Sequence, residues 1–412
     1  MSDAGDLEAA YRDDATRIRA ALAARLGDVG LAEDCVQDAF VAALEHWPAD
    51  GIPPNPGGWL AMTARRKAID RLRRERAGQE KLALVAVGQR SRAGPARSAE
   101  PDPGPEQRAA DDLLGLIFAC CHPLLSRQSQ IALTLRAVCS LTTAEIATAF
   151  LTTEPTMAQR LTRARQALRT TGEPVRVPEP DQLAARLDEV LAVIYLLFNE
   201  GYLASTGRTP ARRDLARQAI SLTRLLHQLM PREPEVLGLL ALQLLHESRA
   251  ATRFDGWGRL VRLSDQDRAR WDRALMEEAT RLLSVATTMR KAGPYQLQAA
   301  IAAIHTAAPS YQRTDWPQIR ALYDRLQEIT PSPVIQLNRA VATSFAVSPQ
   351  AALAEVESLG AELGEYRLFH AVGAELLSDL GRDAVARAAN AWALALAANP
   401  AERELLSRRL LL

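Results

Sequence analysis

The sequence predicts an all-α protein, and three observations support this prediction. The 412 residues are 48% hydrophobic but only 5% aromatic, and Ala, Leu and Arg dominate, which favours helices over sheets. Apolar residues recur at helical spacing in every substantial segment. No segment alternates between apolar and polar residues for long enough to predict a strand.

Two stretches rich in turn-forming residues divide the chain. The longer one, Val87–Pro105, has no apolar periodicity and is typical of a linker. The shorter one, Thr170–Pro180, contains three prolines and one glycine. We therefore expect a first helical domain at 5–86, a linker at 87–105, a second domain at 106–170 and an extension at 181–412.

The first domain is expected to contain a helix that is acidic on one side. Val36, Phe40, Leu44 and Trp47 recur at i, i+4, i+8 and i+11, which predicts a buried stripe. The other side of this helix carries the polar residues Glu33, Asp34, Gln37 and Asp38.

A basic helix is expected next, after a loop at Pro48–Gly58. It runs over Trp59–Arg76, and seven Lys or Arg residues against two acids lie between positions 65 and 76. Asp70 can form i, i+4 pairs with Arg66 or Arg74. Although a basic helix alone is often only a solvated surface, its place after an acidic helix and a Pro/Gly loop is a specific arrangement.

A second basic segment has the pattern of a helix-turn-helix. Thr142–Glu145 predicts a capping box at the start of a short helix. A break at Phe150–Thr153 precedes a second helix, with Pro155 in its first turn. Its inner stripe is Met157, Leu161, Ala164 and Leu168, and its outer face carries Thr156, Gln159, Arg160 and Arg163. Because the second helix of this motif enters the major groove, the pattern predicts duplex DNA as a partner.

The extension is expected to consist of stacked helical pairs. Three apolar helix ends are each followed by a proline, at Pro231, Pro331 and Pro400. The gaps of 100 and 69 residues are close to multiples of the ~34-residue tetratricopeptide period. An irregular helical domain is the alternative, since an Ala- and Leu-rich chain gives such spacings by chance.

Several function classes are disfavoured. The longest apolar run, Val190–Phe198, is too short to span a bilayer, and the acidic N-terminus does not resemble a signal peptide. The four cysteines show no disulfide spacing, so a reduced cytoplasmic location is expected. Cys120-Cys121-His122 predicts small buried side chains rather than a metal site. No catalytic motif is present, and we expect no catalytic residue, metal or cofactor.

These segments resemble a known family. Leu31–Phe40 and Gly58–Arg74 resemble regions 2.2 to 2.4 of an extracytoplasmic-function (ECF) sigma factor, and the helix-turn-helix resembles region 4.2. The remainder resembles the ECF subgroup with a long tetratricopeptide-like C-terminal extension, for example at Leu197–Tyr202. Two departures are Arg66, where Asn or a similar polar residue is usual, and Val138–Ser140, where a Gly is common.

The resemblance implies a dissociable subunit of bacterial RNA polymerase that directs the enzyme to particular promoters. The polymerase clamp would bind the acidic face, which consists of Glu33, Asp34, Gln37 and Asp38. The loop and basic helix would capture the unstacked strand of the −10 element through Trp59, Arg65, Arg66, Asp70, Arg71, Arg73 and Arg74. In the −35 element Gln159, Arg160 and Arg163 would read bases, with Thr156 and Arg165 nearer to phosphates.

The extension is too large to be a passive tail. We expect it to pack against the sigma domains and to control their availability, with Asn199, Glu200 and Tyr202 near that contact. The same three residues are also explained as the capped end of an apolar helix. Two alternatives remain for the whole chain: a helix-turn-helix regulator with a helical ligand-sensing domain, and an enzyme housed in the C-terminal helices. Binding to core polymerase would distinguish them.

Overall fold

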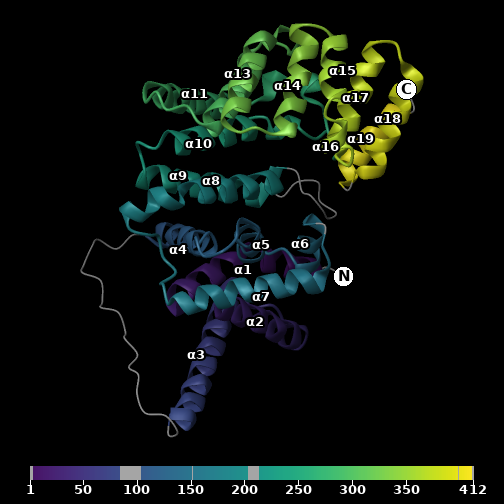
Figure 1. Cartoon of the computed structure of the whole chain (residues 1–412). Helices are drawn as coiled ribbons and strands as arrows, with labels where there is room; N and C mark the ends of the chain where they lie inside the picture. Colours follow the sequence, from purple (N-terminus) through teal and green to yellow (C-terminus); the bar gives the residue numbers. More distant parts are fainter. Residues whose placement is uncertain (1–2, 84–103, 151, 203–212, 398, 411–412) are drawn as a thin grey trace. The chain divides into compact units, whose positions relative to one another are not determined.

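The computed structural model is helical throughout the part of the chain that it describes (Figure 1). It describes residues 3–83, 104–150, 152–202, 213–397 and 399–410. Within these ranges no strand forms, and β geometry is limited to one isolated bridge between Phe254 and Leu260. The predicted all-α fold is therefore confirmed. Nearly all of the expected linker, Val87–Pro105, lies outside the described residues.

The chain divides into two compact units, Met1–Leu197 and Phe198–Leu412. The first unit contains α1 (Asp3–Leu26), α2 (Val29–Asp50), α3 (Pro56–Ala83), α4 (Pro105–Cys120), α5 (Arg127–Ala137), α6 (Thr143–Ala149), α7 (Glu154–Thr171) and most of α8 (Pro180–Tyr202). The second contains α9 (Arg213–Leu229), α10 (Pro234–Glu247), α11 (Arg273–Thr288), α12 (Pro294–Ala307), α13 (Trp316–Ile329), α14 (Pro333–Ala346), α15 (Pro349–Glu357), α16 (Gly360–Leu363), α17 (Arg367–Asp379), α18 (Asp383–Leu396) and α19 (Pro400–Leu410).

The helices of the first unit share one core. α1 packs against α2, α3 and α4, while α5 packs against α4, α6 and α7. Leu60 on α3, Phe118 on α4, Leu133 on α5 and Met157 on α7 are fully buried. Because α2 also contacts α7, the acidic helix and the second helix of the helix-turn-helix lie side by side although they are far apart in the sequence.

The loop between the acidic and basic helices is shorter than the sequence pattern predicts. α2 continues through Pro48, and the chain turns at Gly51, whose φ of +81° is a conformation that favours glycine. Asn55 then starts α3, because its side chain accepts a hydrogen bond from the Gly58 backbone NH at 2.9 Å. The loop is therefore 51–55 rather than Pro48–Gly58. Leu44, expected in the buried stripe, is 58% exposed.

The helix-turn-helix forms from the residues that the pattern indicates. The Thr142 backbone NH donates to the Glu145 carboxylate at 2.7 Å, and the Glu145 NH donates back to the Thr142 hydroxyl at 3.2 Å, which completes the capping box before α6. Thr153 caps α7. Ser140 has φ +54°, which explains why a glycine suits this position.

Sequential pairing dominates the second unit, as in a helical-repeat array. Each helix from α9 to α15 packs against its neighbour in the chain, and α17, α18 and α19 continue this order. The last three pairs begin at Trp316, Pro349 and Asp383, 33 and 34 residues apart. The regular spacing does not extend back to α9, because an irregular segment with three short 3₁₀ helices, 248–272, follows α10.

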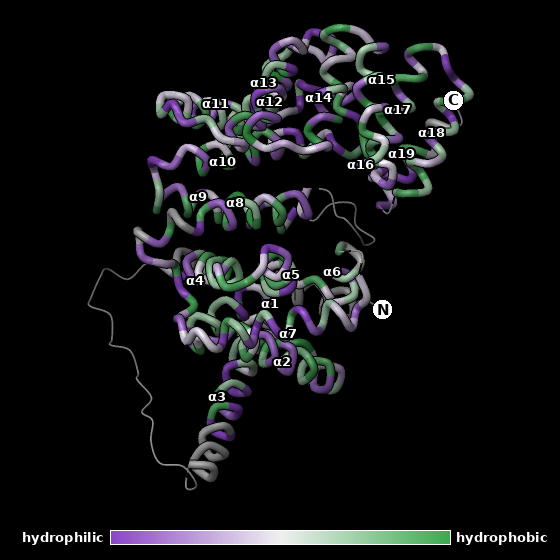
Figure 2. Tube along the Cα trace, viewed as in Figure 1, coloured by the Kyte–Doolittle hydropathy of each residue, from purple (hydrophilic) through white to green (hydrophobic). Residues whose placement is uncertain are grey.

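The distribution of hydropathy follows this packing. α10 is buried along almost its whole length. α3, by contrast, carries both hydrophilic and hydrophobic residues along the part that Figure 2 colours. None of the described helices is long and apolar enough to cross a membrane.

Candidate nucleic-acid interface

The expected acidic face of α2 is divided in two by the fold. Asp34 is exposed, and Gln37 and Asp38 are partly exposed. Glu33, in contrast, is only 1% exposed. The expectation that all four residues form one accessible surface is therefore wrong for this conformation, because α2 turns Glu33 toward α5 and α7.

Glu33 is held between two arginines of the second helical domain. Its carboxylate lies 2.5 Å from Nε of Arg136 on α5 and 2.5 Å from Nη2 of Arg165 on α7. Arg165 was expected near DNA phosphates, but here its guanidinium faces α2. A carboxylate buried to this extent requires such partners, since an unpaired buried charge is strongly unfavourable.

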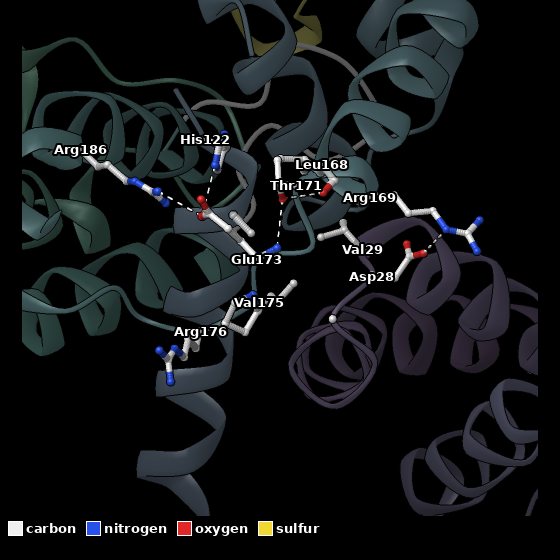
Figure 3. A pocket seen from close by; sticks show the side chains of 13 residues that line it. Asp28, Val29, His122, Leu168, Arg169, Thr171, Glu173, Val175, Arg176 and Arg186 are labelled. Carbon is white, nitrogen blue, oxygen red and sulfur yellow. Dashed lines mark hydrogen bonds and ion pairs between the residues drawn. The ribbon is translucent and has the colours of Figure 1, made fainter. Parts of the chain in front are cut away.

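Other contacts support the same packing of the two domains. Asp28, the N-cap of α2, forms an ion pair with Arg169 near the end of α7, with 3.4 Å between Oδ2 and Nε (Figure 3). The Thr16 hydroxyl on α1 donates to the Val138 carbonyl at 2.8 Å. The Arg19 guanidinium donates to the Ala137 carbonyl. The recognition helix is thus fixed against the first domain at several points.

The exposed acids of α2 are paired with the basic helix. Arg71 on α3 lies 3.0 Å from Asp34 and 2.7 Å from Asp38. Burial of the guanidinium opposes its charge, but the hydrogen bond to Asp34 and the charge of Asp38 outweigh this effect and raise the pKa of Arg71. Arg71, expected in the −10 contact, therefore also orients the two carboxylates expected to bind polymerase.

Most of the charged residues of α3 that were expected at the −10 element point to solvent. Arg65, Arg66, Asp70, Arg73 and Arg74 are exposed. Trp59, in the first turns of this helix, packs edge-on against Trp47 of α2, with 5.5 Å between ring centroids. The two tryptophans and the loop residues 51–54 line an open hollow of about 470 Å³. An aromatic hollow beside exposed arginines is suited to a splayed base and its phosphate backbone.

The recognition helix presents a polar face away from its buried stripe. Met157, Leu161 and Ala164 are buried. Thr156, Gln159 and Arg163 are exposed, whereas Arg160 is partly buried with its guanidinium 5.6 Å from the centre of the Phe150 ring. Among the residues expected at the −35 element, Arg165 is therefore set apart, because it faces α2. Thr156, Gln159, Arg160 and Arg163 remain on the outer side of the helix.

The segment after α7 is also tied to the domain that carries the helix-turn-helix. The carboxylate of Glu173 lies 3.2 Å from Nε2 of His122 and 3.3 Å from Nη2 of Arg186 on α8 (Figure 3). Partial desolvation opposes the charge of Glu173, but hydrogen bonds from His122 and Arg186 outweigh it and lower the pKa of this carboxyl. The first compact unit consequently extends to Leu197, beyond the expected boundary at residue 170.

The three residues expected at a regulatory contact lie at the end of α8. Asn199 and Glu200 are partly buried. Tyr202 packs inside the second unit, where its hydroxyl accepts a hydrogen bond from Arg249 at 3.1 Å. The guanidinium of Arg253 lies 3.2 Å above the Tyr202 ring.

Sequence reasoning did not identify the contacts of Asp28, Arg136, Arg249 and Arg253. It also did not place Trp47 beside Trp59 in the wall of the hollow. Asp28 could have been found as an N-cap residue before the acidic helix. Arg136 has no local signal, because its partner is 103 positions away. Around the described cysteines and histidines, no group of three or more potential ligands could hold a metal ion.

Comparisons with known proteins agree with this geometry. Residues 10–78 match Sigma-70 region 2, residues 116–168 match Sigma-70 region 4, and residues 186–287 match a family of unknown function, DUF6596. An uncharacterized protein of Rhizobium meliloti (strain 1021) is 42% identical over 402 residues, which are 98% of this chain and 94% of that protein. No solved structure matches the chain.

Regions 2 and 4 of the Sigma-70 family occur in the expected order, and these two matches show the family and its function. Core RNA polymerase and promoter DNA are the partners of such proteins. The chain belongs to the sigma-70 family as an ECF-like alternative sigma factor, which directs promoter-specific transcription and carries a C-terminal extension of helices.

Proposed function

We propose that Asp34, Gln37 and Asp38 form the polymerase contact of the resting protein, and that Glu33 joins it only after region 4 has moved away. The exposure of Asp34 and the pairing of both aspartates with Arg71 support this assignment. The ion pairs hold the carboxylates in place before the partner arrives, which lowers the entropy cost of binding.

For the −10 element, the hollow between Trp47 and Trp59 would receive an unstacked base of the non-template strand. The exposed arginines Arg65, Arg66, Arg73 and Arg74 would follow the phosphates of that strand, with Asp70 and Arg71 beside them. Aromatic stacking combined with a basic track is the usual way in which proteins hold single strands.

For the −35 element, Gln159, Arg160 and Arg163 would read base edges in the major groove. Their place on the outer face of α7 supports this proposal, and Arg and Gln are suited to bidentate contacts with guanine and adenine. Thr156, at the N-terminal end of the helix, would contact a phosphate. Arg165 would do so only after it has left Glu33.

We infer that region 4 must separate from region 2 before both promoter elements are bound. Arg165 touches Glu33, the adjacent Asp34 touches Arg71, and Arg71 shares a helix with Arg65. With 1.5 Å of rise per helical residue, these contacts keep the two DNA-binding surfaces within about 40 Å of each other. Promoter positions −10 and −35 are about 85 Å apart in B-form DNA. The ion pairs of Glu33 carry this proposal.

A reversible cross-link tests the opening. The substitutions Asp28→Cys and Arg169→Cys replace an ion pair between α2 and α7, and a short reducible thiol cross-linker would join them. All four native cysteines are buried. Burial also raises the pKa of Cys35 and raises that of Cys120 to about 12, which disfavours the reactive thiolate.

The cross-linked protein should lose at least tenfold in promoter-dependent initiation with core polymerase, and reduction should restore it. Each single-cysteine variant treated with the same reagent is the control. Full activity of the cross-linked double variant would exclude a required opening. Loss of activity that reduction does not reverse would indicate damage to the DNA-binding surface instead.

The extension is proposed to control the sigma domains, with Asn199, Glu200 and Tyr202 near the contact. Two truncations test this proposal. A cut after Gly172 removes Glu173 and Arg186 from region 4, whereas a cut after Tyr202 keeps these contacts. Higher initiation after the second cut would mean that the extension inhibits the sigma domains, and lower initiation would mean that it provides a required contact. Unchanged initiation would exclude control by the extension.

We further propose that the chain acts in the cytoplasm by binding alone, with the chemistry carried out by polymerase.

A further inference from the structure

The second unit contains a cluster of arginines at an unusual depth for this residue type. Arg249 is 9% exposed and Arg253 is 8% exposed. Both lie in the irregular segment after α10. Burial lowers the pKa of Arg268 in the same segment, and the nearby charge of Arg249 lowers it further. Three like charges therefore lie close together in one unit, two of them on buried side chains and the third on a partly buried one.

These arginines lack carboxylate partners among the residues that the structure describes. Elsewhere in the unit Arg367 pairs with Glu402 at 2.7 Å, and Arg213 pairs with Glu247 at 3.2 Å. By contrast, Nε of Arg249, Nη1 of Arg253 and Nη2 of Arg268 are buried without a hydrogen-bond partner in the described part of the chain.

Neutral groups provide the contacts that the cluster does have. Arg249 donates to the Tyr202 hydroxyl at 3.1 Å and contacts Nδ1 of His246 at 2.8 Å. Arg253 stacks over the Tyr202 ring at 3.2 Å. Burial lowers the pKa of Arg253 to about 10, and the charge of Arg249 acts in the same direction. Glu402 favours the charge of Arg253 from a distance, but its carboxylate is bound by Arg367.

A pocket opens beside Arg253. It has a volume of about 190 Å³ and is lined by Tyr202, Arg213, Glu247 and Arg253 together with the apolar residues Ala216 and Phe254. A side chain that is more than nine-tenths buried, charged and incompletely hydrogen-bonded thus borders a cavity with partly apolar walls. Buried charges in proteins are normally paired, so this cavity is where a missing anion would fit.

We propose that the pocket binds a small organic acid, whose carboxylate pairs with Arg253 and whose apolar body packs against Ala216 and Phe254. The planar guanidinium matches a carboxylate in geometry. The carboxylate of Glu247 also lines the pocket, and its negative charge is offset only by the ion pair with Arg213. An anion with two charges, such as inorganic phosphate, is therefore disfavoured, because Glu247 would repel it more strongly than a singly charged carboxylate. The apolar walls favour an aliphatic or aromatic body.

The test measures thermal unfolding of the full chain, without polymerase or DNA. Sodium hexanoate, sodium benzoate and sodium phosphate are compared with sodium chloride at equal ionic strength. Hexanoate or benzoate at about ten times its Kd should raise the Tm of the second unit by about 3–6 °C. The Arg253→Met variant should lose this rise, and Arg232→Met, at an exposed arginine of the same unit, should keep it.

The Tm without ligand separates binding from a structural role. If Arg253 is kept for a ligand, Arg253→Met removes an incompletely paired buried charge and leaves the Tm unchanged or higher. If its stacking on Tyr202 is purely structural, the same variant has a lower Tm and its response to the acids is unchanged, which would overturn the proposal.

Two further results would also overturn it. One is a rise of the Tm with phosphate but not with either organic acid. The other is an unchanged Tm of the wild-type protein with all three anions. If Arg253→Met does not fold, Arg253→Lys keeps the charge without the planar fork and should weaken binding at least tenfold. Wild-type affinity in that variant would contradict the pairing with Arg253.

Discussion

Glu33 on α2 lies 2.5 Å from Arg165 on α7, so a carboxylate of sigma region 2 forms an ion pair with the recognition helix of region 4. Arg136 binds the other oxygen of the same carboxylate. The pair joins the helix expected to bind polymerase to the helix expected to read DNA. In the proposed opening, exposure of Glu33 to polymerase and release of Arg165 to DNA would therefore be the same structural event.

Glu33→Gln should weaken the packing of region 4 against region 2. Glutamine keeps the shape of the side chain but leaves Arg136 and Arg165 without a carboxylate, and breaking a buried ion pair costs about 3–5 kcal/mol. We expect a larger radius of gyration by small-angle X-ray scattering. Initiation at limiting polymerase should change as well, because the substitution frees region 4 but also removes a carboxylate that is proposed to join the polymerase contact. Glu45→Gln, at an exposed position of the same helix, should change neither. Unchanged scattering and initiation in Glu33→Gln would contradict the prediction.

Reversal of the exposed acids, Asp34→Arg with Asp38→Arg, should weaken binding to core polymerase at least tenfold and leave the fold intact. The physical reason is like-charge repulsion where a favourable contact is expected. Because the reversal also removes both ion pairs of Arg71, Arg71→Gln is the matched control for their loss. Equal losses of affinity in the two variants, measured by fluorescence anisotropy, would locate the effect in Arg71 rather than in a polymerase contact.

Arg160→Ala should relax recognition of the −35 element at one or two base pairs. A lost bidentate base contact costs about 1–3 kcal/mol, and other positions should be unaffected. Initiation measured on a set of promoters with single base changes tests this. Gln166→Ala, at an exposed position of the same helix, should leave the profile unchanged. A wild-type promoter profile for Arg160→Ala would exclude base reading by this residue.

The second unit should lose stability as the pH falls from about 6.5 toward 4. Burial lowers the pKa of His305 to about 4, and the charges of Arg249 and Arg268 act in the same direction. An unfolded histidine titrates near 6.5, so the unfolded chain takes up this proton first. The contribution of His305 to the free energy of unfolding is fully present above pH 6.5. It decreases, by at most about 3 kcal/mol, as the pH falls to the pKa of His305 in the folded protein.

His305→Phe isolates this contribution. The aromatic ring would still pack against Tyr311 and Trp316, but it cannot take up a proton. Calorimetric unfolding between pH 7 and 4.5 should show a shallower decrease of Tm in the variant than in the wild type. An equal decrease in both would show that other groups, such as His246, whose pKa burial also lowers, account for the acid sensitivity.

Local patterns in the sequence predicted the elements of the sigma regions well. The capping box at Thr142 and Glu145 forms with the predicted reciprocal hydrogen bonds. The Pro- and Gly-rich run Pro48–Gly58 predicts too long a loop after the acidic helix, because Pro48 fits in the last turn of α2. The period of the last helical pairs was expected from proline-terminated helices, whereas the irregular segment 248–272 has no periodic signal.

The sequence by itself determined what depends on neighbours within a few residues: helix faces, caps, the helix-turn-helix and the order of the two sigma regions. It could not decide that Glu33 faces inward while Asp34 faces outward, since both lie on the polar side of one helix. That choice depends on Arg136 and Arg165, which lie 103 and 132 positions away. Only the packing of α2 against α5 and α7 brings these charges together, and the cost of an unpaired buried carboxylate then fixes their arrangement.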